Sequence, residues 1–120
     1  IAANAVATGG VQLVGGPLLP LALPATPSPQ LTVGMRAGSL RVSAAEGDVT
    51  VMGKVELAEI SGSDTFVHLK TPVGELVAQL TGVHHFELGA QVSLYFNPAQ
   101  VDVFDALGLL VQAPVRGGGR

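Results

Sequence analysis

Alternation of apolar and polar residues is the feature that most limits the folds open to this chain. Its clearest example runs from Asp48 to Ala58. The odd positions of this segment are apolar or glycine: Val49, Val51, Gly53, Val55 and Leu57. Thr50, Lys54 and Glu56 are polar residues at even positions, on the opposite face. Because successive side chains of a strand point to opposite faces, the segment is predicted to be a half-buried strand whose odd positions face the core.

The same alternation returns along the rest of the chain, and no segment keeps apolar residues at helical spacing for three turns. The later alternating segments are 67–70, 75–80, 91–96 and 101–103, and shorter apolar runs occupy 11–14, 18–23 and 31–35. Turn-forming residues separate the later segments at 61–64, 71–74, 88–89 and 97–98. Short strands at regular spacing between such turns predict an all-β fold of the small-barrel type.

The composition is that of a globular domain with a packed core. Of the 120 residues, 48% are hydrophobic and 12% are charged, so one compact unit is expected. The net charge is -3, so no basic face is expected that could bind a phosphate backbone. Only four Phe and one Tyr are available to stack on bases, so nucleic acid is not expected as a partner. The absence of cysteine excludes a disulfide framework and is compatible with the cytoplasm.

The most apolar stretch, Val11 to Ala25, is too short and too often interrupted by Gly and Pro to cross a membrane as a helix. Direct membrane insertion is therefore not expected. No basic segment precedes an apolar run, so no secretory signal is predicted, and a start at Ile1 suggests a fragment of a longer chain.

A P-loop for nucleotide hydrolysis is not encoded. Such a loop needs Gly-Lys followed by Ser or Thr, because backbone amides cradle the phosphates while Lys and the hydroxyl serve phosphate and magnesium. The only Gly-Lys pair, Gly53-Lys54, is followed by Val55 inside the alternating strand. We therefore predict that the chain is not an enzyme by itself, with no catalytic, metal or cofactor-binding residues.

One group of side chains is of the type that binds zinc: His68, His84, His85 and Glu87. Adjacent residues of a strand face opposite ways, so His84 and His85 reach one metal only from a loop. Since no ligand spacing supports a site, an ordinary surface loop is preferred.

Two further groups have a structural and a chemical interpretation. Asp102 and Asp105 could act as a paired acid and base, but residues 105–108 are predicted to form a tight turn after the last strand. Ser61 to Thr65 could form an anion-binding nest, yet the same residue types serve as a hairpin turn far more often.

The order of the segments resembles a known family. The segments that carry the resemblance are Gly53-x-Val55, Ile60-Ser-Gly-Ser-Asp-Thr-Phe-Val-His68, Gly74-Glu-Leu-Val-Ala78, Leu88-Gly89-x-x-Val92-x-Leu94-x-Phe96 and Val101-Asp-Val-Phe-Asp105-Ala-x-Gly108. From about Val33 to Leu110 they look like the transport-associated OB (TOBE) domain of maltose-type and glycerol-3-phosphate-type importer ATPases. The family's Gly-x-Arg-Pro-Glu stretch is similar to Gly34-Met35-Arg36, which is followed here by Ala37-Gly38 instead.

The resemblance implies an OB-fold-like domain built from one or more small barrels of short antiparallel strands. It implies a single domain over residues 1–112, with lead-in strands over 1–45 and a main barrel over 46–112. Residues 113–120, with three consecutive glycines, are expected to form a flexible tail.

The function that the resemblance implies is that of a non-catalytic C-terminal regulatory and dimer-supporting domain of the ATP-binding subunit of an ABC importer. Phe104-Asp105 favours the branch that imports sugars or sugar phosphates. The expected partners are the ABC ATPase domain of the same polypeptide, its dimer mate and a regulatory protein. The expected location is the cytoplasm, peripheral to the inner membrane as part of a transporter complex.

The alternative is a small-oxyanion module of the molybdate type. In related domains, backbone amides and a few Ser, Arg or Lys groups hold the anion, and those domains open with a Ser-Ala-Arg-Asn-like stretch. Nothing between Asp48 and Ala58 resembles that stretch. A generic OB barrel for nucleic acid or sugar polymers is a further alternative, which the acidic balance and sparse aromatic residues disfavour.

Overall fold

The computed structural model describes residues 1–6, 9–23 and 28–112 of the chain, so the tail expected over 113–120 lies outside the described residues. Within the described residues the fold is all-β, as predicted, with ten strands and two short 3-10 helices. The strands are β1 (Ala2–Ala5), β2 (Val11–Leu13), β3 (Leu18–Leu19), β4 (Gln30–Gly34), β5 (Val49–Ser61), β6 (Asp64–Thr71), β7 (Gly74–Thr81), β8 (Gln91–Phe96), β9 (Asp102–Phe104) and β10 (Leu110–Gln112). The 3-10 helices are η1 (Ala37–Ser39) and η2 (Pro98–Gln100).

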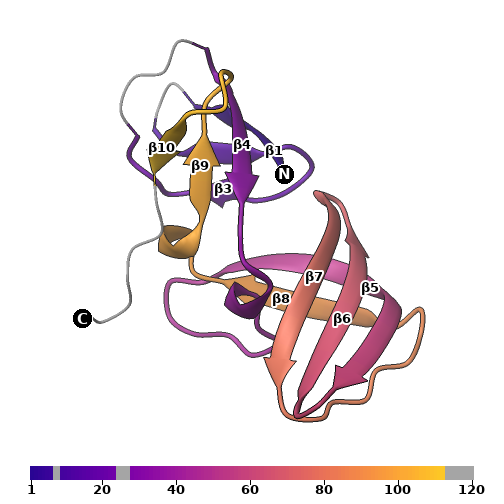
Figure 1. Ribbon diagram of the computed structural model, residues 1–120. Helices are drawn as coiled ribbons and strands as arrows, with labels where there is room; N and C mark the ends of the chain where they lie inside the picture. Colours follow the sequence, from indigo (N-terminus) through magenta and orange to yellow (C-terminus); the bar gives the residue numbers. More distant parts are fainter. Residues whose placement is uncertain (7–8, 24–27, 113–120) are drawn as a thin grey trace.

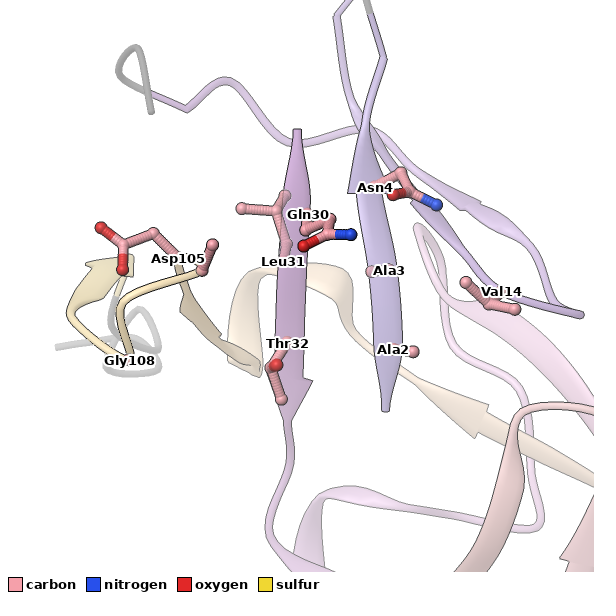
Figure 2. A pocket seen from close by; sticks show the side chains of 10 residues that line it. Ala2, Ala3, Asn4, Val14, Gln30, Leu31, Thr32, Asp105 and Gly108 are labelled. Atoms are coloured by element: carbon pink, nitrogen blue, oxygen red, sulfur yellow. The ribbon is translucent and has the colours of Figure 1, made fainter. Parts of the chain in front are cut away.

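The strands form two antiparallel sheets that make two lobes (Figure 1). The first sheet has the order β10-β9-β4-β1-β2-β3, and the close view in Figure 2 shows β4 beside β1. The second sheet has the order β7-β6-β5-β8. The chain leaves the first sheet after β4 through η1 and returns to it after β8 through η2 (Figure 1).

This pairing cuts across the expected division at residue 45. The expected main barrel over 46–112 includes β9 and β10, but β9 pairs with β4, joining Val103 to Val33 across the expected boundary. β1 pairs with one edge of β4 and leaves the other edge with unpaired backbone groups. A strand from far along the chain, β9, forms hydrogen bonds with that second edge. Alternation within a strand carries no information about which strand pairs with it.

Two strands were not predicted from alternation. β1 consists of three alanines and one asparagine, and β10 follows a turn rich in leucine. β1 nevertheless lies between two partners, with Ala3 opposite Leu13 on β2 and opposite Leu31 on β4. Main-chain hydrogen bonds to two neighbouring strands therefore compensate for its weak intrinsic strand preference.

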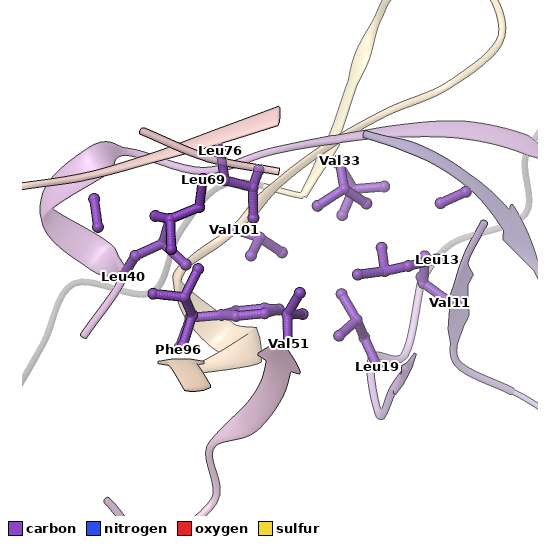
Figure 3. Close-up of a cluster of buried hydrophobic side chains, with 14 of the residues drawn as sticks. Val11, Leu13, Leu19, Val33, Leu40, Val51, Leu69, Leu76, Phe96 and Val101 are labelled. Carbon is purple, nitrogen blue, oxygen red and sulfur yellow. The ribbon is translucent and has the colours of Figure 1, made fainter. Parts of the chain in front are cut away.

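One apolar core is shared by the two sheets. Figure 3 shows Val11, Leu13, Leu19 and Val33 from the first sheet on one side of a single cluster. The other side of the cluster carries Leu40, Val51, Leu69, Leu76 and Phe96. Burying one apolar side chain of this size stabilises the folded state by about 1.5–3 kcal/mol relative to leaving it exposed. Because the cluster is continuous, neither sheet buries its apolar face alone.

Two turns, one from each sheet, also pack closely against each other, and the contact involves two glycines. The turn between β2 and β3 contains Gly15 and Gly16, and the turn between β6 and β7 contains Pro72 and Val73. A Cβ atom on Gly16 would collide with the Val73 side chain, and one on Gly15 would collide with the Pro72 carbonyl. Only glycine permits this close approach, and Gly15 also has a φ of +83°, which favours glycine.

The predicted faces of the central strand are confirmed over most of its length and wrong at one end. Val51, Gly53 and Val55 are buried, whereas Leu57 is 46% exposed rather than part of the core. The cause is a bulge: Val55 lies opposite Leu69, but the next pair is Leu57 with His68, so β5 holds one extra residue. A shift of one residue sends every later side chain to the other face. On β6 and β7 the predicted core faces are buried: Val67, Leu69, Leu76, Ala78 and Leu80.

The bulge gives a prediction that separates two neighbouring apolar residues. Val55→Asp should lower the free energy of unfolding by about 3 kcal/mol or more, because it buries an unpaired charge. Leu57→Asp should cost about 1 kcal/mol or less, because that side chain faces solvent after the bulge. Urea unfolding of the two variants measures both values. Equal losses would mean that the bulge is absent in solution.

Candidate functional site

The zinc-type residues of the sequence are not brought together. His68 Nε2 lies 3.1 Å from Glu59 Oε1 across β5 and β6, and both residues face outward. His84 Nε2 lies 2.8 Å from the Thr81 carbonyl, and the His84 ring stacks on Phe86 with centroids 6.3 Å apart. In the part of the chain that the structure describes, no group of three or more His, Cys, Asp or Glu could hold a metal ion.

The segment considered as an anion nest forms the hairpin turn between β5 and β6. Gly62, at a φ of +62°, supplies the positive φ that a two-residue hairpin loop requires. Thr65 is fully buried, and its hydroxyl donates to the Gly82 carbonyl at 2.9 Å and accepts from the His84 amide at 2.9 Å. Because both hydrogen-bonding roles of this hydroxyl are filled, Thr65 fixes the 82–84 connection and is not available to an anion.

The two aspartates considered as an acid–base pair have separate roles. Asp105 is 9% exposed, and its Oδ1 accepts hydrogen bonds from the amides of Leu107 at 2.9 Å and Leu109 at 3.0 Å. The Gly108 amide also donates to the Asp105 carbonyl at 3.0 Å, which confirms the predicted tight turn. Asp102 lies on β9 opposite Gly34. Asp105 is therefore a turn residue that holds the β9–β10 connection.

A half-buried ion pair that no sequence pattern predicted lies in the connection between η1 and β5. Arg41 Nη2 lies 2.7 Å from each carboxylate oxygen of Asp48, whose side chain is 4% exposed. Asp48 Oδ2 also accepts from the Ala45 amide at 2.8 Å. Arg41 in turn pairs its main chain with Tyr95 on β8. No periodic pattern links an arginine and an aspartate seven residues apart in a loop, so no sequence signal pointed to this pair.

A hollow of about 550 Å³ lies on the outer face of the first sheet, against the β9–β10 turn (Figure 2). Ten residues line it: Ala2, Ala3, Asn4, Val14, Gln30, Leu31, Thr32, Asp105, Ala106 and Gly108. The strands β1 and β4 supply six of these residues, the turn after β9 supplies three, and Val14 lies just after β2. From the sequence, three of these residues were predicted to lie in the 105–108 turn, and Val14, Leu31 and Thr32 in short strands, but no pattern brought them together.

Apolar side chains are exposed beside this region. In the β9–β10 turn and at the start of β10, Leu107 is 73%, Leu109 is 62% and Leu110 is 54% exposed. Val14, just after β2, is 52% exposed, and Leu18 on β3 is 48% exposed. Large apolar side chains exposed close together, as Leu107, Leu109 and Leu110 are along the chain, are a common mark of protein contacts.

The fold and the motifs agree with a comparison against known families. A model described as the TOBE domain matches residues 33–104, from within β4 to the end of β9. The chain belongs to the TOBE domain family. The matched part of this TOBE domain includes the complete second sheet and the pairing of β4 with β9.

A curated relative of this TOBE domain is the multiple sugar-binding transport ATP-binding protein MsmK of Streptococcus mutans. The two are 37% identical over 70 residues, which cover 58% of this chain and 19% of the relative. The similarity thus concerns about a fifth of the relative's length. Among the described residues of the TOBE domain, no helix has the length and apolar character that a membrane span requires.

The role of Asp105 can be measured directly. Asp105→Ala should reduce the free energy of unfolding by about 1–2 kcal/mol, because two amides of the turn lose a charged acceptor. Asp102→Ala, the matched control on β9, should cost less than about 0.5 kcal/mol. Chemical denaturation followed by circular dichroism gives both values, and a larger loss at Asp102 would contradict the turn assignment.

The hairpin at residues 61–65 predicts an outcome for oxyanions. Saturable binding of molybdate or sulfate needs several convergent donors, but Thr65 is engaged and the carboxylates of Asp64 and Glu59 lie on the same hairpin. We expect no saturating amide shifts at these residues below about millimolar anion. Saturation at micromolar molybdate would support the oxyanion module instead.

Proposed function

We propose that the TOBE domain is the non-catalytic C-terminal regulatory and dimer-supporting domain of the ATP-binding subunit of an ABC importer for sugars or sugar phosphates. The observation that carries the proposal is the 37% identity to a multiple sugar-binding transport ATP-binding protein. The partners are then the ABC ATPase domain of the same polypeptide, its dimer mate and a regulatory protein. The location is cytoplasmic, peripheral to the inner membrane.

The engagement of the polar side chains supports a role without chemistry of its own. Within the described residues, Thr65, Asp105 and Asp48 use their oxygens to hold connections between strands. A nucleophile or general base needs a lone pair that can reach a substrate. The oxygens of these three side chains are instead hydrogen-bonded to backbone groups. The absence of a P-loop from the 120-residue sequence agrees with this role.

The exposed apolar residues support a role in protein contacts. Leu107, Leu109 and Leu110 lie within four consecutive positions of one protruding turn and strand. When a partner protein covers large apolar side chains that are exposed together, their surface is removed from water, and this favours binding. The ATPase domain of the same polypeptide and the dimer mate are the partners proposed above.

Nucleotide binding tests the non-catalytic part of the proposal. Titrating ATP with Mg²⁺ into the chain in a calorimeter should give no binding heat, because no loop cradles the phosphates. An affinity in the range of about 1 μM, equivalent to about 8 kcal/mol, would overturn the accessory role. Sequencing the codons upstream of Ile1 tests the transporter part, since a P-loop and an ABC signature are expected there.

A further inference from the structure

The hollow on the first sheet gathers three neutral polar side chains that lack partners. Asn4 on β1 and Gln30 and Thr32 on β4 are all exposed and all line it (Figure 2). Within the described residues none of the three side chains makes a hydrogen bond. By contrast, Gln12 on β2 donates to two carbonyl oxygens, those of Leu13 and Gly16.

The register of the strands places these groups on one surface. Asn4 lies directly opposite Gln30, and Thr32 lies directly opposite Ala2. Side chains opposite each other in an antiparallel pair have Cβ atoms about 4.5–5.5 Å apart, so the two amides form one pair of adjacent polar groups. Ala2, the residue opposite Thr32, has a small side chain, and Val14 also lines the hollow.

The hollow carries no positive charge. None of its ten lining residues is Lys, Arg or His. Its one ionisable group is the Asp105 carboxylate, which is engaged with the amides of its own turn and points away from β4 in Figure 2. A phosphate or other anion would find no cation among the lining side chains, so the hollow suits a neutral ligand.

The chemistry of the three side chains selects the class of neutral ligand. Each amide presents an N–H donor and a carbonyl acceptor side by side, and the Thr32 hydroxyl both donates and accepts. The hydroxyls of a sugar also donate and accept, and neighbouring ones on the ring match an amide in spacing. Val14 and Ala2 offer apolar surface to the C–H groups of a ring. A volume of about 550 Å³ lies in the range of small-molecule sites and suits a monosaccharide or disaccharide.

We propose that this hollow binds a neutral sugar through Asn4, Gln30 and Thr32, and rejects sugar phosphates. The proposal adds a small-molecule input to the regulatory role and does not depend on it. The two proposals can fail independently, because the nucleotide and upstream-codon tests do not involve the hollow. The domain could regulate a transporter without binding sugar, or bind sugar without belonging to a transporter.

The test is a titration of the isotopically labelled chain followed by the side-chain NH₂ signals of Asn4 and Gln30. The probes are glucose, galactose, maltose and sucrose, with glucose 6-phosphate as the charged comparison. We expect saturating shifts of both signals with at least one neutral sugar at a Kd of about 1 mM, as suits an open site with few hydrogen bonds. Glucose 6-phosphate should bind at least about tenfold more weakly than glucose.

A double variant and a matched control link binding to the hollow. Asn4→Leu with Gln30→Met keeps side-chain size but removes both amides, and binding should weaken about tenfold or more. Gln91→Met, at an exposed position of the edge strand β8 in the second sheet, should bind as the parent does. Melting temperatures measured alongside show that both variants fold. No saturation with any neutral sugar, unchanged binding in the double variant or tighter binding of glucose 6-phosphate would each overturn the proposal.

Discussion

The antiparallel pairing of β4 with β9 is the contact on which the two-sheet arrangement depends. It joins Val33 to Val103, whose side chains are 1% and 0% exposed, although the two lie far apart in the sequence. The complete second sheet lies in the loop that this pairing closes. The entropy cost of closing a loop grows only slowly with its length, so the shared core can offset it. The TOBE match over 33–104 begins and ends at this same pairing.

The polar residues of the TOBE domain follow from this arrangement. A fold of ten short strands has many connections to fix, both within each sheet and between the sheets, and backbone groups in them need partners. Thr65, Asp105 and the Arg41–Asp48 pair satisfy those groups. Asp105, which the sequence offered as one half of an acid–base pair, is therefore committed to structure. This is the physical basis for proposing a regulatory rather than an enzymatic role.

The outer face of the first sheet differs from these connections, because Asn4, Gln30 and Thr32 are held in place by strands but make no side-chain hydrogen bonds within the described residues. β1 and β4 also bury Ala3 and Leu31 in the core on their opposite face. A ligand seated over Asn4 and Gln30 would therefore contact the same two strands that carry part of the shared core. Binding energy spent there would favour one arrangement of β1 and β4 over others. Such a coupling would give the proposed regulatory role a direct chemical input.

The sequence by itself determined the class of the fold and most faces of its strands. Period-two alternation decided that Val51, Val55 and Val67 are buried, because a side chain's face depends only on its parity along a strand. The turn at Asp105 was also local, since an aspartate caps amides two and four residues away. The family resemblance rested on such local segments in order and was confirmed.

Tertiary structure decided what depends on partners from elsewhere in the chain. The exposure of Leu57 follows from a bulge that exists only because β5 pairs with β6 in a particular register. The place of β9 in the first sheet follows from the free edge of β4. The hollow required Asn4 to lie opposite Gln30 across more than twenty residues of sequence, and no pattern within either segment encodes that neighbour. Alternation along a strand determines which side of the sheet a residue lies on. Strand pairing and register determine which residues lie next to it.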